Sequence, residues 1–415
     1  MRPDLLDILR CPFCGGRLGL VESGFVERDG DDVLSGILGC HCCAFPIVDG
    51  IPVMHLEPAA AEARAHLDAG RADLARRAML GLDSETDARR FDEAAGSPTA
   101  TYRDIVEALG PNFEGGYFLY RFTDPTYLVS EAVVRAVAAT VLAGGGRAID
   151  VCGGSGHLTR TLLDLSTPPP VLADLYFSKV WLGRRFTAPG CAGVCCDGNA
   201  PLPFARGAFR VAVCSDAYHY IWTKRLFASE IIRLTDVGDS RRAVVISHTH
   251  NANQWNPSAG MPLPPQAYRD LFDDLSPRLY GETALLDDVI QRSQVDLSRR
   301  ETMEALDREL ALTLVASTDP SVFQVHAVEA RSVARGEFRV NPLYAETQAG
   351  DAVELTRRFP SDDYEQEYGA ARQYLPESIT VDRAALAALP ARAIPAALAD
   401  AARRRVVIDL PARYY

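Results

Sequence analysis

The chain has 415 residues, of which 47 % are hydrophobic and 24 % are charged, and this composition is typical of a folded globular protein and excludes a mainly disordered chain. Its formal net charge of −12 argues against non-specific adhesion to nucleic acid or to anionic membranes. No apolar run reaches the roughly 18–20 residues of a membrane span, and the first residues lack the apolar core of a secretory signal. We therefore expect a cytoplasmic protein of two or three domains.

Cysteines are concentrated at the start of the chain, where five of the ten lie within the first 43 residues. Residues 11–14 read CPFC and residues 40–43 read CHCC, so two Cys-x-x-Cys pairs are separated by 25 residues. Two such pairs can place four thiolates around one tetrahedral Zn²⁺, and the metal then supplies folding free energy that so short a segment cannot gain from a core. The spacing favours Cys11, Cys14, Cys40 and Cys43 as ligands of a structural zinc. His41 or Cys42 could take the place of one of them.

The segments on either side of these pairs resemble a known family. The sequence LLDILR (residues 5–10) precedes the first pair, and FPIVDGIPVM (residues 45–54) follows the second. Together, residues 3–56 resemble the small zinc-ribbon proteins that activate tRNA and protein methyltransferases by binding beside them. The resemblance implies that residues 1–56 form a zinc ribbon with a structural metal, and that a methyltransferase lies nearby.

Residues 57–111 are rich in alanine, arginine and acidic residues and contain no strand pattern, so we expect a helical linker. An aromatic segment at residues 114–127 follows. If a cofactor domain comes next, Tyr117, Tyr120 and Arg121 of this segment could cover its mouth.

Apolar strands alternate with helices from residue 147 onward. A strand at residues 147–151 runs into the glycine turn CGGSGH and then into a helix. Further strands are expected at residues 171–174, 192–196, 209–216 and 243–247. Repeated strand–helix alternation predicts a parallel, Rossmann-like doubly wound α/β sheet that binds its ligand at the carboxyl ends of the strands. We assign this domain to residues 112–330.

Acidic residues come at the ends of the first three strands. Asp150 precedes a glycine turn whose backbone N–H groups can approach a ligand closely, and Asp174 is placed to accept hydrogen bonds from ribose hydroxyls. With Asp197 after the third strand, residues 112–260 resemble the class I S-adenosylmethionine-dependent methyltransferases. The resemblance implies that Asp150 and the glycines hold the methionine moiety, Asp174 the ribose and Asp197 the adenine. The implied cofactor-binding residues are Asp150, Gly153, Gly154, Gly156, Asp174, Leu175, Asp197, Gly198, Asn199 and Ser215.

The glycine turn departs from that family at Cys152, where the family usually has glycine. The departure leaves open weakened cofactor binding, and with it a regulatory protein that binds the cofactor without catalysis. A dinucleotide-dependent oxidoreductase is another alternative for such a sheet, but the turn reads Gly-Gly-x-Gly rather than Gly-x-Gly-x-x-Gly. We therefore favour the methyltransferase.

Three of the eight histidines follow the fourth and fifth strands, at the expected active edge. Methyl transfer to a hydroxyl requires alignment of the acceptor and removal of its proton, which a neutral imidazole is suited to take. We expect His219, His248 and His250 to supply this catalytic base. His248 and His250 also suggest a metal-dependent variant, which we rank lower because no carboxylate is adjacent in the sequence.

The end of the chain is less informative. Residues 301–314 read as an amphipathic helix, and residues 331–415 as an α+β appendage that resembles no family. The appendage could shape the acceptor pocket or mediate homo-oligomerisation.

These features predict an S-adenosylmethionine-dependent O-methyltransferase that acts on a small molecule or glycoside, in secondary metabolism or saccharide modification. An rRNA or tRNA methyltransferase is the alternative, because such enzymes also join an N-terminal zinc knuckle to this fold. The charge of −12 and the absence of a basic stripe count against a nucleic-acid partner. We expect S-adenosylmethionine and a structural Zn²⁺ as cofactors, and no membrane partner.

Overall fold

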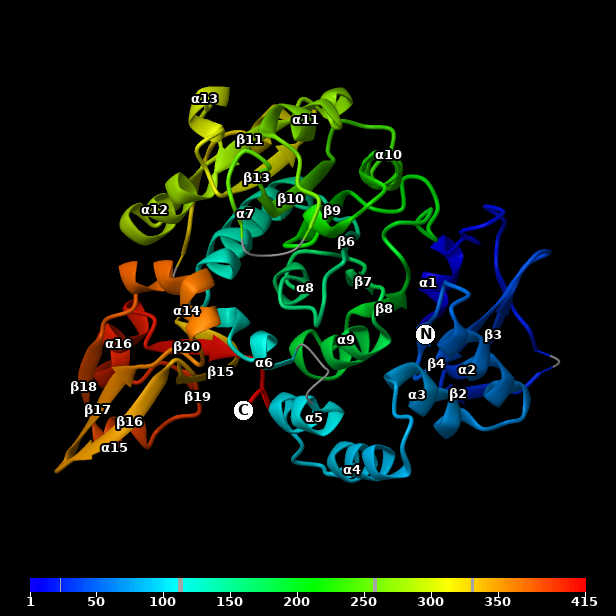
Figure 1. Cartoon of the computed structure of the whole chain (residues 1–415), viewed down its shortest axis with the longest axis horizontal. Coiled ribbons are helices and arrows are strands. Elements are labelled where there is room, and N and C mark those ends of the chain that lie inside the picture. The colour runs from blue at the N-terminus through cyan, green and yellow to red at the C-terminus, as the bar shows by residue number, and fades with distance from the viewer. Residues whose placement is uncertain (23, 111–114, 257–259, 330–331) are drawn as a thin grey trace.

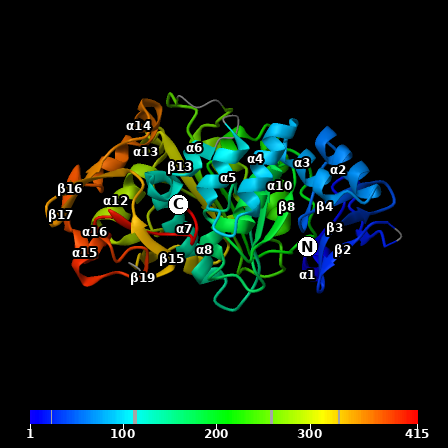
Figure 2. The same ribbon diagram turned by 90° about the horizontal axis from the view of Figure 1, so that it is seen from below.

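The computed structural model describes residues 1–22, 24–110, 115–256, 260–329 and 332–415 (Figure 1). A small N-terminal ribbon lies at one end of the molecule, a seven-stranded sheet in the middle and the C-terminal appendage at the other end, as two perpendicular views show (Figures 1 and 2). The expected domain boundaries at residues 111/112 and 330/331 lie outside the described residues. No helix of the described residues is long and apolar enough to cross a membrane.

The central sheet is Rossmann-like, as predicted, with the strand order β11-β13-β10-β9-β6-β7-β8. Neighbouring strands from β10 to β8 are parallel, and β13 is antiparallel to both of its neighbours. The chain leaves β6 toward β7 and β8 on one side and returns to β9 and β10 on the other, so β6 and β9 flank a topological switch point. The strands are β6 (Ala148–Val151), β7 (Val171–Asp174), β8 (Ala192–Cys195), β9 (Val211–Ser215), β10 (Ala243–His250), β11 (Arg278–Gly281) and β13 (Ala311–Ala316).

Two apolar cores cover the two faces of this sheet, because alternate residues of each strand point to opposite sides. On one face, Val213 and Val245 pack in the same core as the helices α7, α9 and α12. On the other, Cys214 and Ile246 share a core with α10. The helices are α7 (Pro125–Val141), α9 (Phe177–Leu182), α10 (Lys224–Leu234) and α12 (Glu282–Arg292), with the short α8 (Thr159–Leu162) after the glycine turn and α11 (Pro265–Asp270) after β10.

The prediction of one helix over residues 301–314 is wrong. The structure has a short helix, α13 (Met303–Leu306), followed by strand β13. All six residues of β13 are buried, because the strand is inserted between β10 and β11. An apolar segment buried on both faces has no period-two pattern, so the sequence does not distinguish it from a helix.

The ribbon is built around an antiparallel sheet in the order β1-β3-β4-β5, with β2 paired to β3. It joins the central sheet at the edge strand β8, where Val53 forms a parallel bridge to Cys195 and the Met54 N–H donates to the Cys195 carbonyl at 2.7 Å. A second contact pairs Leu9 with Phe204. The ribbon elements are α1 (Pro3–Ile8), β1 (Gly19–Leu20), β2 (Glu27–Asp29), β3 (Asp32–Gly39), β4 (Ala44–Val48) and β5 (Ile51–Pro52).

The linker region is helical, as predicted, and consists of α2 (Pro58–Asp68), α3 (Ala72–Leu80), α4 (Glu85–Gly96) and α5 (Tyr102–Leu109), followed by the single turn α6 (Gly115–Phe118). The appendage is α+β, also as predicted, and it has a core of its own. Its elements are β15 (Val333–Val340), β16 (Tyr344–Ala349), β17 (Ala352–Arg357), α14 (Asp362–Tyr368), β18 (Ser378–Asp382), α15 (Arg383–Leu386), β19 (Ala391–Ala393), α16 (Ala399–Arg403) and β20 (Val407–Leu410).

Candidate functional site

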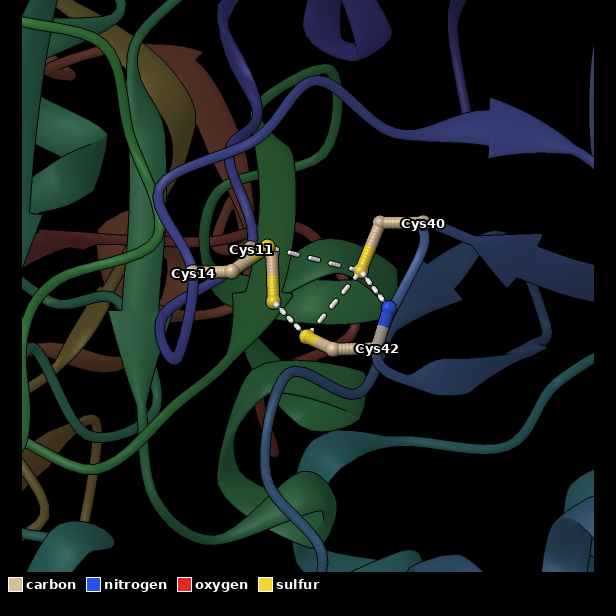
Figure 3. A group of neighbouring side chains, drawn as sticks. All are labelled: Cys11, Cys14, Cys40 and Cys42. Carbon is tan, nitrogen blue, oxygen red and sulfur yellow. Dashed lines mark hydrogen bonds between the residues drawn. The ribbon is translucent and has the colours of Figure 1, made fainter.

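Four cysteine sulfurs converge between two loops of the ribbon (Figure 3). One Sγ each from Cys11, Cys14, Cys40 and Cys42 lies within 4.8 Å of the others. The Cys11–Cys42, Cys14–Cys40 and Cys40–Cys42 sulfur pairs are 3.6, 3.8 and 3.5 Å apart. Four sulfurs at about 2.3 Å from one tetrahedral Zn²⁺ would be about 3.8 Å from one another, so these side chains fit a structural zinc.

This set differs from the one expected from spacing in its fourth member, because Cys42 stands where Cys43 was expected. The Cys43 sulfur lies beside the group, 3.4 Å from that of Cys42. The backbone N–H groups of Cys42 and Cys43 both donate to the Cys40 sulfur. Burial opposes ionisation of Cys40, but these two backbone donors lower its thiol pKa to about 6, which favours the thiolate that a metal needs.

The acidic residues predicted to bind the cofactor lie at one edge of three adjacent parallel strands. Asp150 is in β6, Asp174 ends β7, and Asp197 follows β8 by two residues. Asp174 accepts hydrogen bonds from the backbone N–H groups of Gly154 and Tyr176, both at 2.9 Å, so its carboxylate ties the glycine turn to the second strand. Asp197 accepts the Asn199 N–H at 2.8 Å.

Asp150 is buried beneath the glycine turn and accepts a hydrogen bond from the Thr159 hydroxyl at 2.7 Å. Its other oxygen, Oδ1, has no hydrogen-bond partner among the described residues. Burial, reinforced by the negative charge of Asp174, raises the pKa of Asp150 to about 7. A Cβ on Gly153 would come within 2.7 Å of the Asp150 carboxyl carbon, so this position requires glycine.

Cys152 stands in the glycine turn with φ +58°, in the left-handed region that a side chain rarely adopts. The backbone therefore keeps the conformation that a glycine would give, although the residue carries a thiol. That thiol would lie 3.1 Å from a Cβ placed on Gly198, which brings the turn beside the loop after β8.

The other residues predicted to bind the cofactor differ in their backbone conformation and hydrogen bonds. Gly154 and Gly156 have positive φ within the turn, and the Leu175 carbonyl accepts a hydrogen bond from the Cys195 thiol. The Asn199 side-chain oxygen accepts the Trp222 N–H at 2.7 Å. Ser215 hydroxyl donates to Ser130 of α7 at 3.3 Å, which turns it toward that helix.

The three predicted histidines do come together, around Asp216 at the end of β9. Its Oδ1 lies 4.0 Å from Nε2 of His219 and 3.9 Å from Nε2 of His248. The rings of His219 and His250 stack with centroids 3.7 Å apart. His248 and His250 lie within β10 rather than after it, because the strand continues to residue 250.

The charges around each ring separate the pKa values of the three histidines. Burial lowers the pKa of His219 to about 3 and that of His250 to about 4. The partial burial of His248 opposes its protonation, but the Glu282 carboxylate, 2.6 Å from its Nδ1, raises its pKa to about 9, with a further contribution from Asp216.

The opposite side of Asp216 is held by the aromatic segment and the appendage. Its Oδ2 accepts from Tyr117 Oη and from Arg121 Nη1, both at 3.0 Å. Tyr368 of α14 donates to the Tyr117 hydroxyl, which links the appendage to this cluster. Tyr117 and Arg121, expected over the mouth of the cofactor domain, therefore contact Asp216, whereas Tyr120 packs on Tyr364 of the appendage core.

Asp216, Glu282 and Tyr368 were not predicted as site residues. Asp216 stood in the strand-end segment that also holds His219, and only its chemistry could have singled it out. Glu282 and Tyr368 come from distant parts of the chain with no local motif, so only the tertiary structure reveals them.

Comparison with known proteins gives a clear result for the ribbon. The family model described as Trm112p-like protein matches residues 2–50. A UPF0434 protein of Azotobacter vinelandii (strain DJ) is 46 % identical over 54 residues, which are 13 % of this chain and 74 % of that protein.

Several solved structures are similar to between 41 % and 50 % of the chain. A methyltransferase solved in complex with the Haloferax volcanii Trm112 methyltransferase activator is 16 % identical and covers 45 % of this chain and 89 % of its own, with a TM-score of 0.32. An S-adenosylmethionine-dependent methyltransferase of Thermotoga maritima is 10 % identical over 50 % of this chain and 96 % of its own, with a TM-score of 0.34. A geranyl diphosphate C-methyltransferase of Streptomyces coelicolor A3(2) is 15 % identical and covers 41 % of this chain and 70 % of its own, with a TM-score of 0.31. Similarities at this level carry no argument about activity.

Proposed function

The chain belongs, through its N-terminal ribbon, to the Trm112p-like family, and on that premise we propose that it is an S-adenosylmethionine-dependent methyltransferase with its ribbon in the same polypeptide. The observation that carries the proposal is the common edge at which three adjacent parallel strands bring Asp150, Asp174 and Asp197 beside a glycine turn. A ligand of an open α/β sheet binds outside the carboxyl ends of the strands, at the switch point. Here that point lies between β6 and β9.

The proposed cofactor site has donors and acceptors suited to a nucleoside with a charged tail. Asp174 and Asp197 provide carboxylates for hydroxyl and amino groups, and the turn places backbone N–H groups close to the ligand. The unpartnered Oδ1 of Asp150 is a buried acceptor that a cationic or N–H group of the ligand would satisfy. When bound, the cofactor supplies an electrophilic methyl group on a sulfonium.

The proposed acceptor site is the histidine cluster around Asp216, one strand away from β6. β9 pairs directly with β6 and β10 pairs with β9, so this cluster and the cofactor edge share one rim of the sheet. An acceptor hydroxyl held there can be aligned for in-line attack and can lose its proton to the cluster. We therefore propose O-methylation of a small molecule or glycoside, with His219, His248 and His250 on the acceptor side.

The ribbon supports the same assignment by its place in the fold. It docks on β8, the strand whose following loop holds Asp197, through the Val53–Cys195 bridge. We propose that the zinc-bound ribbon stabilises this loop and so keeps the adenine end of the cofactor site formed.

Two measurements test the proposal. Isothermal titration of the full chain with S-adenosylhomocysteine is expected to show one site with a dissociation constant well below millimolar. Incubation with labelled S-adenosylmethionine and fractionated small-molecule and sugar extracts is expected to yield a labelled small product. A protein that binds the cofactor yet labels no extract would favour the regulatory alternative, and labelling of bulk RNA at low salt would favour the RNA methyltransferase.

A further inference from the structure

A second group of metal-binding side chains lies far from the cysteines, on the acceptor side of the proposed site. One ligand atom each from Asp216, His248 and His250 lies within 4.8 Å of the others. We propose that these three residues bind a divalent transition-metal ion that holds and activates the methyl acceptor, an inference that rests on the proposed function. Two imidazoles and one carboxylate suit zinc, iron, cobalt or manganese and leave coordination positions open for a substrate oxygen.

The backbone directs two of these side chains toward each other. Asp216 and His248 both have positive φ, +53° and +49°, although neither is glycine. The pairing of β10 with β13 shifts register between Ile246 and Thr249, so His248 sits in a bulge. Bulges re-aim side chains next to active sites, and without this one His248 would follow the regular alternation of its strand.

Glu282 holds His248 in the orientation that a metal ligand needs. One carboxylate oxygen lies 2.6 Å from Nδ1 of the ring, and the other accepts the His248 backbone N–H at 2.8 Å and the Thr313 hydroxyl at 2.9 Å. With Nδ1 bound to a carboxylate, Nε2 is left for the cation, and it is Nε2 that lies 3.9 Å from Asp216. Metal-binding histidines usually make such a bond from the nitrogen that does not bind the metal.

The environment of His219 independently supports a ligand site in this space. Its side chain is fully buried, and neither ring nitrogen has a hydrogen-bond partner among the described residues. Its Nε2 lies 4.0 Å from Asp216 Oδ1 and its ring stacks on His250, so it faces the same space. A buried polar group without a partner costs about 1–3 kcal/mol, which a water or an acceptor oxygen on the metal would relieve.

The two carboxylate oxygens of Asp216 face different neighbours. Oδ2 is held by Tyr117 and Arg121, and Oδ1 faces the histidines. Metal–ligand bonds of about 2.0–2.2 Å place ligand atoms roughly 3–3.5 Å apart, so the 3.9 Å between Asp216 and His248 needs to close by less than about 1 Å. Asp216 and Glu282 are partly buried acids that both lie beside His248, and Asp216 also pairs with Arg121. A divalent ion bound by His248 would take the place of the proton whose charge otherwise balances these carboxylates.

The proposed metal changes how the acceptor is deprotonated. An acceptor hydroxyl bound to the cation loses its proton to water at lower pH than a free hydroxyl does, because the cation stabilises the oxyanion. The oxygen then forms a bond to the methyl carbon while the bond from carbon to sulfur breaks, and the products are a methyl ether, a thioether and the released proton. The acceptor class is thus a molecule that presents a hydroxyl or enol oxygen able to coordinate a metal.

Titration of the zinc-loaded full chain with Co²⁺ tests the site. We expect about one Co²⁺ per chain, with weak visible absorption and without the intense near-ultraviolet absorption of cobalt bound to thiolates. Affinity is expected to fall at least tenfold in His250→Ala and Asp216→Asn, and roughly 10–100-fold in Glu282→Gln, which keeps all three ligands. His66→Ala, which removes a histidine on α2, is the matched control and is expected to bind as the wild type does.

Binding of Co²⁺ with the same affinity in all of these variants, or no binding by the wild type, would overturn the proposal. S-adenosylhomocysteine titrations of the same samples keep the two proposals separate. Co²⁺ binding that depends on His250 without S-adenosylhomocysteine binding would support the metal site and contradict the methyltransferase. The reverse result would contradict only the metal site. Circular dichroism of each variant identifies any that has failed to fold. If a ligand variant fails to fold, the Co²⁺ affinity of Glu282→Gln decides the test.

Discussion

Tyr414 and His157 share a hydrogen bond that joins the end of the chain to the glycine turn, with Oη 2.7 Å from Nε2. The same hydroxyl donates to the Phe118 carbonyl at 2.6 Å. A phenol has a single proton to donate, so His157 must donate its own from Nε2. Burial lowers the pKa of His157 well below its ordinary value, which keeps the ring neutral and fixes this arrangement. The appendage therefore anchors the turn at the proposed cofactor site.

Replacement of Tyr414 by phenylalanine is the first prediction. The variant leaves the buried His157 N–H without its acceptor, so we expect the free energy of unfolding to fall by about 1–3 kcal/mol. Because the turn loses its anchor, the affinity for S-adenosylhomocysteine should fall as well. Urea unfolding and calorimetric titration measure the two effects.

Tyr344→Phe is the matched control for this variant. Tyr344 is also a buried tyrosine of the appendage, and its hydroxyl donates to the Pro376 carbonyl, far from the turn. We expect a similar loss of stability with unchanged cofactor affinity. Equal cofactor affinity in the two variants would show that the Tyr414 contact has no bearing on the proposed site.

Asp174→Ala is expected to weaken S-adenosylhomocysteine binding by roughly 10–100-fold. The carboxylate now fixes the backbone N–H groups of Gly154 and Tyr176, and hydrogen bonds to a charged group contribute about 1.5–3 kcal/mol. Asp239→Ala is the control, because Asp239 is an acid that pairs with Arg210 at the surface. If both variants bind the ligand as the wild type does, Asp174 does not contact the cofactor.

Much of the fold was predictable because it is encoded locally. The strand ending at Asp174 and the glycine turn after Asp150 each carry their signal within a few residues, and the alternation of strands with helices determines a parallel sheet. The CPFC and CHCC pairs likewise predict a zinc ribbon, because the cysteines of each pair lie within four consecutive residues. Such short-range patterns can be recognised without knowledge of the tertiary packing.

The cluster of residues around Asp216 could not be predicted in the same way. Asp216 contacts Tyr117 across 99 residues, and His248 contacts Glu282 across 34, so neither pair forms a motif in the sequence. No carboxylate is adjacent to His248 along the chain, but in space Glu282 lies 2.6 Å from its Nδ1 and Asp216 lies 3.9 Å from its Nε2. The choice between Cys42 and Cys43 depends on the conformation of a single loop, which spacing alone does not specify.

Serine variants of two neighbouring cysteines separate the geometric ligand set from the one based on spacing. Cys42→Ser removes a sulfur that lies 3.6 Å from Cys11 and 3.5 Å from Cys40, so we expect it to lose most of its ribbon zinc and to unfold at lower denaturant concentration. Cys43→Ser should keep its ribbon zinc and unfold at the same denaturant concentration as the wild type. Cobalt exchanged into the ribbon gives thiolate absorption that reports the number of bound sulfurs, and a Cys43→Ser variant that loses this absorption would restore the spacing-based set.

The pH dependence of stability tests the buried Asp150. Its pKa is raised to about 7 in the folded protein by burial, against an ordinary value near 3.8, and the groups that act on it are Thr159, Asp174 and Arg121. Between these two pKa values the folded state keeps a proton that the unfolded chain has released. The free energy of unfolding therefore falls as pH rises from about 4 to about 7 and then levels off, with a total contribution of roughly 4 kcal/mol.

Asp150→Asn isolates this contribution, because an amide keeps the shape of the carboxyl and can accept from Thr159 but does not ionise. Every other titrating group is common to the two proteins and cancels in the difference between their free energies of unfolding. When urea unfolding is repeated from pH 5 to pH 8, the free energy of unfolding of the wild type should fall relative to that of Asp150→Asn. Most of this change should occur below about pH 7. A difference that stays constant over this range would mean that Asp150 ionises in the folded protein as readily as in the unfolded chain, and that the carboxylate already has a partner in the absence of any ligand.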